Sequence, residues 1–379
     1  MTEKLYYKDA YIKDFTATVL SASEVDGRFE VILDRTAFFP EEGGQSADNG
    51  TIAGVRVLDV TEREGVVYHF LESAPALGVV ECHIDFDERF QKMQCHTAEH
   101  ILSGYIHKLF GFDNIGFHLG DVEVTMDING VLTRAQLDEI EYLANMAVFA
   151  NVEVTTSFPS KDELSALKYR SKLDLVDDVR IVNIGEYDSC ACCAPHVART
   201  GEIGLIKILD FEKHRGGLRL YITAGVRALY DYRNKYTNVQ RVSALFSEPQ
   251  NEIGAAAERF LESLANTKAK LKEKCLESAV LKAQMIEPTE KNMVLLYPDM
   301  SMDEMREFSN VAMKKVAGLL VVLSGNDGEY RYIISYDGRE LSGLAKEFNS
   351  SLSGRGGGRG SMIQGTFYTS LESIRAYFE

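Results

Sequence analysis

The amino-acid sequence predicts an α+β protein with four parts: an N-terminal β-barrel-like subdomain, a metal-binding α/β domain, a helical or coiled-coil linker and a C-terminal α/β domain. The chain has 379 residues, which is enough for two or three domains. Its first 90 residues are rich in short β-forming runs, and residues 255–286 form a long segment without glycine or proline. We place the parts at 1–90, 91–225, 226–288 and 289–379.

Residues 1–90 are expected to be mostly β-structure. The β-rich runs at 17–34 and 53–72 are broken by turn sequences, such as Val25-Asp26-Gly27 and Asp48-Asn49-Gly50. A small barrel or a twisted antiparallel sheet fits this pattern.

Residues 91–225 alternate between helical and strand patterns. Apolar residues recur at helical spacing over 91–107, and a second amphipathic helix is predicted over 134–150. Strands are predicted at 152–158, 180–185, 203–212 and 218–225. A mixed α/β domain follows from this alternation.

Residues 226–288 are predicted to be helical. Between 253 and 271, apolar and small residues are spaced alternately four and three apart, as in a coiled coil or a helical hairpin. A single packed helix between domains explains the pattern equally well. Pro288 ends this segment.

Residues 289–379 are predicted to form a separate α/β domain. Strands at 293–299, 318–324 and 330–337 alternate with helical sequence such as 303–315, which predicts parallel pairing. A glycine-rich sequence, GRGGGRGSMIQG, follows at 354–365 and is expected to be a loop.

The composition restricts the classes of function. The chain has 41 basic and 57 acidic residues, so its net charge of −16 argues against a broad nucleic-acid-binding surface but permits a local basic patch. The N-terminus lacks the apolar segment of a signal peptide, and the longest apolar run, 316–323, is too short to span a bilayer. We therefore expect a cytoplasmic protein without a membrane partner.

Two pairs of side chains suggest a metal site. His96 and His100 lie four residues apart on one predicted helix face, and Cys192 and His196 lie four apart about ninety residues later. Thiolate and imidazole are preferred ligands of Zn²⁺, so these four residues predict a zinc site. Cys190 and Cys193 are expected to be small buried side chains. Because the helix also has the order H-x-x-E-H, a zinc peptidase with Glu99 as its base is an alternative.

A polar loop at 33–50 carries further candidate site residues. Adjacent glycines, Gly43 and Gly44, permit close approach of the backbone to a ligand, and they precede Gln45 and Asp48. Taken alone, the loop is better explained as a hairpin connection.

Together, these motifs resemble the editing domain of alanyl-tRNA synthetase and its free-standing relatives, the AlaX-type trans-editing proteins. The matching motifs are T-x-F-x-P-E-x-G-G-Q-x-x-D-x-G at 36–50, I-D-x-x-x-R at 84–89, H-T-x-x-H at 96–100, G-F-H-L-G at 116–120, C-x-x-x-H-V at 192–197 and G-G-L-R-L-Y-I-T-A-G at 216–225. The sequence at 354–365 is similar to the glycine-rich signature of the DHH-associated domain. The whole pattern resembles the long AlaX form, with an editing domain, a coil and a C-terminal domain.

The resemblance implies ATP-independent hydrolysis of the ester that links serine, or glycine, to the alanine tRNA, which is a translation-fidelity function. It assigns recognition of the serine hydroxyl to Thr36, and we expect Gln45 and Asp48 to make polar contacts near the scissile ester. It retains a zinc ion on His96, His100 and Cys192, with His196 or a water molecule as fourth ligand. Two departures bear on substrate specificity: the family's usual C-G-G-T-H is Cys-Cys-Ala-Pro-His here, and Glu42 replaces a small residue.

The tRNA is expected to contact basic and glycine residues outside the zinc site. The candidates are Arg215, Arg219, Arg227, Lys268, Lys272, Arg355, Gly356, Gly357, Gly358 and Arg359. Consecutive glycine amides can cradle a phosphate group. The coil could also pair with a second copy in a homodimer. Besides the peptidase, a non-catalytic tRNA-binding module with structural zinc remains an alternative.

Overall fold

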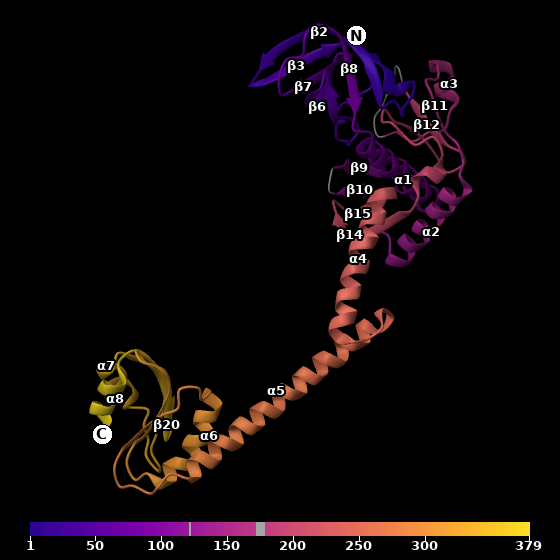
Figure 1. The fold of residues 1–379 in the computed structure, drawn as a ribbon. Coiled ribbons are helices and arrows are strands. Elements are labelled where there is room, and N and C mark those ends of the chain that lie inside the picture. The colour runs from indigo at the N-terminus through magenta and orange to yellow at the C-terminus, as the bar shows by residue number, and fades with distance from the viewer. Residues whose placement is uncertain (121–122, 172–178) are drawn as a thin grey trace. The chain divides into compact units, whose positions relative to one another are not determined.

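The computed structural model describes residues 1–120, 123–171 and 179–379. The chain forms two compact units, Met1–Val239 and Gln240–Glu379. Both contain sheets and helices, so the structure is the mixed α/β molecule that the sequence predicts (Figure 1). The four-part division of the sequence stays a prediction. Among the described residues, no helix combines the length and the apolar character needed to cross a membrane.

The first unit begins with a closed six-stranded barrel. Its strands, in the order of their pairing, are β2 (Asp14–Val25), β3 (Arg28–Leu33), β7 (Val66–Leu71), β6 (Val55–Arg63), β5 (Gly50–Ile52) and β8 (Gly78–Ile84). Asp26 and Gly27 have positive φ values of 51° and 75°, as a tight hairpin between β2 and β3 requires. Fully buried side chains such as Val31, Leu33 and Val57 fill the interior. A short 3-10 helix, η1 (Leu5–Tyr7), and a two-stranded ribbon of β1 (Glu3–Lys4) and β4 (Arg35–Thr36) precede and interrupt these strands.

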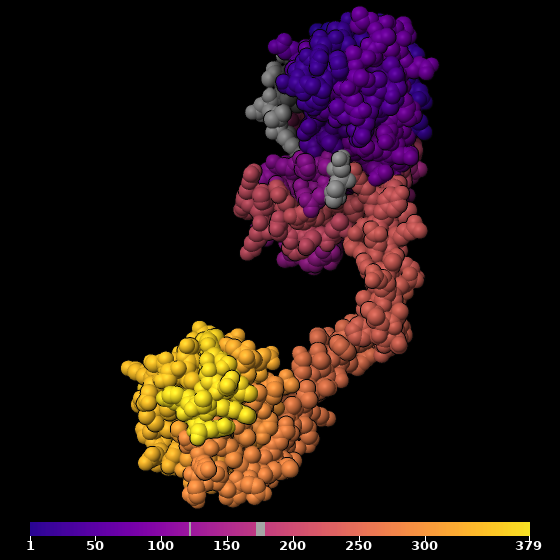
Figure 2. Space-filling view, turned by 60° about the vertical axis from the view of Figure 1, so that its left-hand side comes forward, coloured from indigo at the N-terminus to yellow at the C-terminus, as the bar shows by residue number. Residues whose placement is uncertain are grey.

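The second part of this unit is built around α1 (Phe86–Phe110). One four-stranded sheet has the order β14 (Ile206–His214), β15 (Gly217–Ala224), β10 (Val124–Ile128), β9 (Asn114–Leu119), and a three-stranded sheet has the order β11 (Val154–Ser157), β12 (Ile181–Ile184), β13 (Asp188–Ala191). The remaining helices are α2 (Arg134–Ala150), α3 (Lys161–Ala166) and the 3-10 helix η2 (Thr200–Ile203). Most of α1 is buried, including His96 and His100, which are two of its three histidines. In the space-filling view, the indigo barrel and the magenta α/β part lie directly against each other (Figure 2).

The predicted helix over 134–150 matches α2 because local signals define its ends. Thr133 caps the N-terminus in a reciprocal capping box with Gln136, and Asn151 ends the helix in the left-handed conformation with φ 49°.

Helix α4 (Gly225–Phe246) begins in the first unit and ends in the second. The second unit continues with η3 (Gln250–Glu252) and the long helix α5 (Ile253–Gln284), followed by α6 (Met302–Ala312), η4 (Met313–Lys315), α7 (Ala345–Ser351) and α8 (Leu371–Phe378). Phe260, Leu264 and Leu271 of the predicted coiled-coil seam are 54%, 39% and 63% exposed in this chain. Only a second copy of the chain could cover these side chains in a coiled coil, so the coiled coil stays a prediction.

The sheet of the second unit corrects two predictions. Its order is β16 (Met293–Leu296), β17 (Leu320–Asn326), β18 (Glu329–Ser335), β20 (Met362–Phe367), β19 (Gly354–Arg359). Only β16 and β17 are parallel, because the short Asp327-Gly328 connection makes β17 and β18 an antiparallel hairpin. The glycine-rich segment is strand β19 rather than a loop.

The glycines of β19 allow close contact between strands. A Cβ atom added at Gly356 would lie 2.4 Å from the carbonyl oxygen of Gln364, and one at Gly358 would lie 2.7 Å from that of Met362. Consecutive amides of a strand point in opposite directions, so Gly356, Gly357 and Gly358 do not converge on one phosphate group. The strand geometry argues against a phosphate cradle made by all three glycines, and their contact with tRNA stays a prediction.

Candidate metal centre

Four side chains predicted as ligands converge between α1 and the segment after β13. One nitrogen each from His96, His100 and His196 and the sulfur of Cys192 all lie within 4.8 Å of one another. The sulfur of Cys192 lies 3.5 Å from Nε2 of His96 and 3.4 Å from Nε2 of His196. The structure thus brings together residues almost a hundred positions apart in the sequence, and the group could hold a metal ion.

Local contacts explain this convergence. His96 and His100 stack on one face of α1, with ring centroids 5.5 Å apart. The segment after β13 is held by Arg180, whose Nη1 donates to the carbonyl oxygens of Cys192 at 2.9 Å and Ala194 at 2.8 Å. These two bonds fix the backbone on both sides of residue 193.

Each imidazole is oriented by a hydrogen bond on its Nδ1 atom. The partners are Gln45 Oε1 for His96 at 2.8 Å, Asp188 Oδ2 for His100 at 2.9 Å, and Thr97 Oγ1 for His196 at 3.0 Å. The Thr97 hydroxyl donates to the carbonyl of Met93, so it accepts the proton of His196 Nδ1. In all three rings Nδ1 carries the proton, which leaves Nε2 as the atom that can bind a metal.

The electrostatics suit a thiolate. Burial opposes ionisation of Cys192, but the electrostatic influence of the surrounding imidazoles of His96, His196 and His100 holds the pKa of this thiol well below its ordinary value. Burial lowers the pKa of His196 to about 3, so this ring is neutral. Burial also works against the charged form of His100, but its hydrogen bonds to Asp188 and Cys192 raise its pKa well above the usual range. A bound divalent cation would replace the positive charge that this imidazolium places beside the thiolate.

Two family models match the first unit. Residues 179–221, which include Cys192 and His196, match the threonyl and alanyl tRNA synthetase second additional domain, and residues 2–85 match the class II (A) tRNA synthetases. The alanyl-tRNA editing protein AlaX-L of Pyrococcus horikoshii is 29% identical over the whole of both chains. Over its whole length this chain is therefore similar to an AlaX-type alanyl-tRNA editing protein.

Alanine–tRNA ligases are longer relatives of this chain. The ligase of Halobacterium salinarum is 34% identical over 86% of this chain and 38% of its own length, and that of Thermococcus kodakarensis is 31% identical over 100% and 43%. The chain therefore spans about two fifths of these ligases. One solved structure, the C-Ala domain of Aquifex aeolicus alanyl-tRNA synthetase, is similar over 24% of this chain and 95% of its own, with 16% identity and a TM-score of 0.21.

The polar loop places Gln45 beside the candidate metal ligands. Its Oε1 accepts from His96, whereas its Nε2 is buried without a hydrogen-bond partner among the described residues. Gly44 has φ 83°, and a Cβ atom there would lie 2.1 Å from the carbonyl oxygen of Phe117. Gly44 thus permits close approach of the loop to strand β9, and close approach of the loop to a ligand stays a prediction.

Asp48 and Thr36 have their own partners. The Asp48 carboxylate accepts from the backbone N–H of Phe39 and forms a buried ion pair with Arg89. Thr36 is fully buried, and its Oγ1 lies 2.8 Å from Nε2 of His69. Because Nδ1 of His69 donates to the carbonyl of Val31, the Thr36 hydroxyl must donate its proton to His69. Thr36 can therefore only accept from a further hydroxyl group.

The neighbouring acidic and cysteine residues have different environments. Glu99 accepts hydrogen bonds from Ser103 and Asn114, so its carboxylate is committed away from the role of peptidase base. Cys190 is buried, whereas Cys193 is only partly buried. Burial, the Cys192 thiolate and the Glu42 carboxylate, which is hydrogen-bonded to Cys193, raise the pKa of the Cys193 thiol. The two departures from the family pattern, at 42 and 193, thus contact each other.

The predicted tRNA-binding residues are divided between the two units. Arg219 forms a bidentate ion pair with Asp127 at 2.7 and 2.8 Å, and Lys272 pairs with Asp303 at 2.7 Å, which reduces the charge that each offers to a phosphate. Arg227 donates to the carbonyl of Gly120 at 2.8 Å. Exposed positions are occupied by Arg215, Lys268, Arg355 and Arg359.

Of the residues that orient the ligands, only Gln45 is predicted from the sequence. Asp188, Arg170 and Arg180 belong to no recognisable motif, because each acts through a contact made far away in the chain, and Thr97 lies in the H-T-x-x-H motif without an assigned role. A cluster of Asp188 with His100 and Cys190 is a second group of metal-type side chains in the described part of the structure.

Proposed function

We propose that this protein is a zinc-dependent hydrolase that deacylates alanine tRNA mischarged with serine or glycine, acting in the cytoplasm. The observation that carries the proposal is the convergence of one thiolate and three correctly oriented imidazoles in a chain similar to an AlaX-type protein. The printed name of the Pyrococcus horikoshii relative, alanyl-tRNA editing protein, supports the same substrate class.

The donor set fits zinc. A tetrahedral zinc ion with bonds of about 2.3 Å to sulfur and 2.0–2.1 Å to nitrogen needs sulfur–nitrogen separations of about 3.5 Å. The separations of 3.5 and 3.4 Å between Cys192 and the rings of His96 and His196 match this requirement. We therefore assign His96, His100, Cys192 and His196 as the residues that would hold the ion.

When bound, zinc would supply a positive charge that polarises the ester or orients the substrate. A closed shell of four protein donors leaves no open position for water, which favours orientation over hydroxide generation. Gln45 would hold His96 with its oxygen and donate its buried, unpartnered Nε2–H to the carbonyl oxygen of the ester, where negative charge develops. Asp48 would stabilise the loop, since its carboxylate accepts hydrogen bonds from the backbone N–H of Phe39 and the side chain of Arg89.

Thr36 is the proposed contact for the serine hydroxyl. Because its proton is donated to His69, the serine hydroxyl would have to donate to Thr36. An alanyl ester lacks this donor and would leave a buried oxygen with one partner fewer. The exposed apolar residues of α5 support the proposed homodimer, and Arg215, Lys268, Arg355 and Arg359 are the favoured tRNA contacts.

The test is hydrolysis of seryl-tRNA(Ala) by the full chain, with zinc content measured on the same samples. His100→Ala should lose both zinc and activity. His107→Ala is the matched control, because His107 lies on the same helix but is 51% exposed and contacts Asp113. Activity that survives in zinc-free His100→Ala protein would refute the zinc-dependent mechanism.

A second candidate, a tRNA-binding module with structural zinc, is favoured by the closed set of four donors. It predicts stoichiometric zinc and tRNA binding without ester hydrolysis in the wild-type protein. The peptidase alternative is disfavoured by the contacts of Glu99.

A further inference from the structure

We propose that Arg170 and Asp188 are positioning residues for His100, and that the cluster of His100, Asp188 and Cys190 is the outer part of one metal centre rather than a second metal site. This inference rests on the proposed zinc site and assigns a role to two residues outside its ligands.

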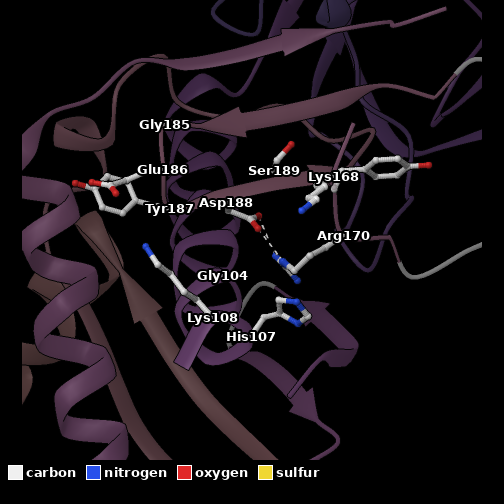
Figure 3. Close-up of a pocket in the computed structure, with 11 residues that line it drawn as sticks. Gly104, His107, Lys108, Lys168, Arg170, Gly185, Glu186, Tyr187, Asp188 and Ser189 are labelled. Atoms are coloured by element: carbon white, nitrogen blue, oxygen red, sulfur yellow. Dashed lines mark hydrogen bonds and ion pairs between the residues drawn. The ribbon is translucent and has the colours of Figure 1, made fainter. Parts of the chain in front are cut away.

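Asp188 joins the two partners through short hydrogen bonds. Its Oδ2 accepts from Nδ1 of His100 at 2.9 Å. Its two oxygens accept from Nε and Nη2 of Arg170 at 2.7 and 2.9 Å (Figure 3). The side chains of His100, Asp188 and Arg170 are 3%, 1% and 16% exposed. A buried carboxylate held in two directions by a planar guanidinium has one fixed orientation, and it passes this orientation to the imidazole ring.

The fold brings this carboxylate to α1 through a close approach. A Cβ atom added at Gly104 would lie 2.1 Å from the carbonyl oxygen of Tyr187 and 3.1 Å from Cβ of Asp188, so only glycine permits the contact. Gly104 lies one helical turn after His100 on the same face. The start of β13 therefore reaches the ring that it must orient.

The backbone of Arg170 is tied to the same strand. Its N–H donates to the carbonyl of Ser189 at 2.8 Å, and its carbonyl accepts from the N–H of Ala191 at 2.9 Å. The next residue after β13 is the ligand Cys192. One strand thus carries the carboxylate that orients His100 and leads directly to the thiolate, which couples the position of Arg170 to two ligands.

A second cation in this cluster is disfavoured by the contacts already present. The guanidinium of Arg170 holds a positive charge against both oxygens of Asp188, so a metal ion there would face a like charge. Nδ1 of His100 is the proton donor to Asp188, and Nε2 faces the first centre. The cluster therefore has no free nitrogen for a second metal, and one ion per chain is expected.

Arg170 also lines a pocket of about 310 Å³, together with residues such as Lys108, Lys168 and Tyr187 (Figure 3). This volume is ample for a small guanidinium ion. The pocket makes chemical rescue feasible, because an added ion could reach the place of a truncated arginine side chain.

The experiment measures zinc affinity and stoichiometry of the full chain by competition with a chromophoric chelator, without tRNA. Asp188→Asn should weaken zinc binding by about 10- to 100-fold while the stoichiometry stays at one. Arg170→Ala should also weaken binding, and methylguanidinium should restore the affinity, whereas methylammonium at the same concentration should not. Restoration by one ion of matched charge but not the other is a result that general destabilisation would not produce.

The matched control is Asp127→Asn, which breaks the bidentate pair with Arg219 in the same unit. This variant should keep the wild-type zinc affinity. Wild-type affinity in Asp188→Asn, or two ions per chain of which Asp188→Asn removes one, would overturn the inference. The zinc measurement contains no tRNA, so it can support the positioning role even if the protein does not hydrolyse the ester. Conversely, the protein can hydrolyse the ester even if Asp188 and Arg170 do not affect zinc affinity.

Discussion

Acid should destabilise the N-terminal barrel through one residue, His69. This histidine is completely buried on β7, between the hydroxyl of Thr36 and the carbonyl of Val31. Burial lowers its pKa from 6.5 to about 4. A folded-state pKa below the unfolded value means that the neutral ring stabilises the fold above pH 6.5 and that this stabilisation is lost as the pH falls through about 4.

The magnitude follows from the shift. A difference of about 2.5 pKa units corresponds to about 3.5 kcal/mol, at roughly 1.4 kcal/mol per unit. About 2.5 kcal/mol of this should be lost by pH 4.5, where an unfolded histidine is almost fully protonated and the buried ring is not. Protonation would also place a proton on Nε2 of His69, so the Thr36 hydroxyl could no longer donate to it.

The assay is urea unfolding of the full chain at pH 7.5 and pH 4.5, followed through the transition of the Met1–Val239 unit. In His69→Gln the loss of unfolding free energy between the two pH values should be smaller than in wild type by about 2.5 kcal/mol. The control is His83→Gln on the same barrel, because the His83 side chain is 61% exposed and its partner is the exposed carboxylate of Asp14 rather than a group of the core. Equal losses in wild type and His69→Gln would show that burial of His69 does not control the acid response.

Three further outcomes are expected. Thr36→Val should reduce the preference for seryl over alanyl ester, by up to roughly 10⁴-fold in relative kcat/KM, whereas Thr36→Ser should keep it; an unchanged ratio in Thr36→Val would remove this residue from substrate recognition. When the metal is present at about 1,000 times its Kd, its removal by a chelator should lower the Tm of the Met1–Val239 unit by about 8–16 °C in calorimetry. The transition of the Gln240–Glu379 unit should not move. Equal shifts in both transitions would contradict a metal centre confined to the first unit. Gly356→Ala should destabilise the second unit by about 1–3 kcal/mol in urea, since its Cβ would lie 2.4 Å from a carbonyl oxygen, whereas Gly357→Ala, with nothing within 4 Å, should not. Similar costs for the two glycine variants would mean that β19 is not packed as described.

Where local chemistry decides an element, the sequence analysis predicted it well. Helix α2 is defined by its capping residues and its apolar periodicity, both of which lie within the segment itself. The pairing of β17 and β18 was predicted wrongly because strand alternation was given more weight than Asp327-Gly328, the local turn that makes a hairpin. The glycines of β19 resemble a loop in sequence, because the carbonyl groups that exclude a side chain there belong to β20.

The sequence alone determined which chemical groups are available and at what spacing. Two histidines four apart and a Cys-x-x-x-His motif are enough to predict a metal site, because ligand type and helical geometry are local properties. Only the tertiary structure decided which nitrogen of each ring faces the sulfur, since that depends on Gln45, Asp188 and Thr97, which are brought to the rings by folding. It also decided that Thr36 donates its proton to His69. A hydrogen bond has a direction and a range of a few ångströms, so its partners are selected by contact in space and leave no periodic trace in the chain.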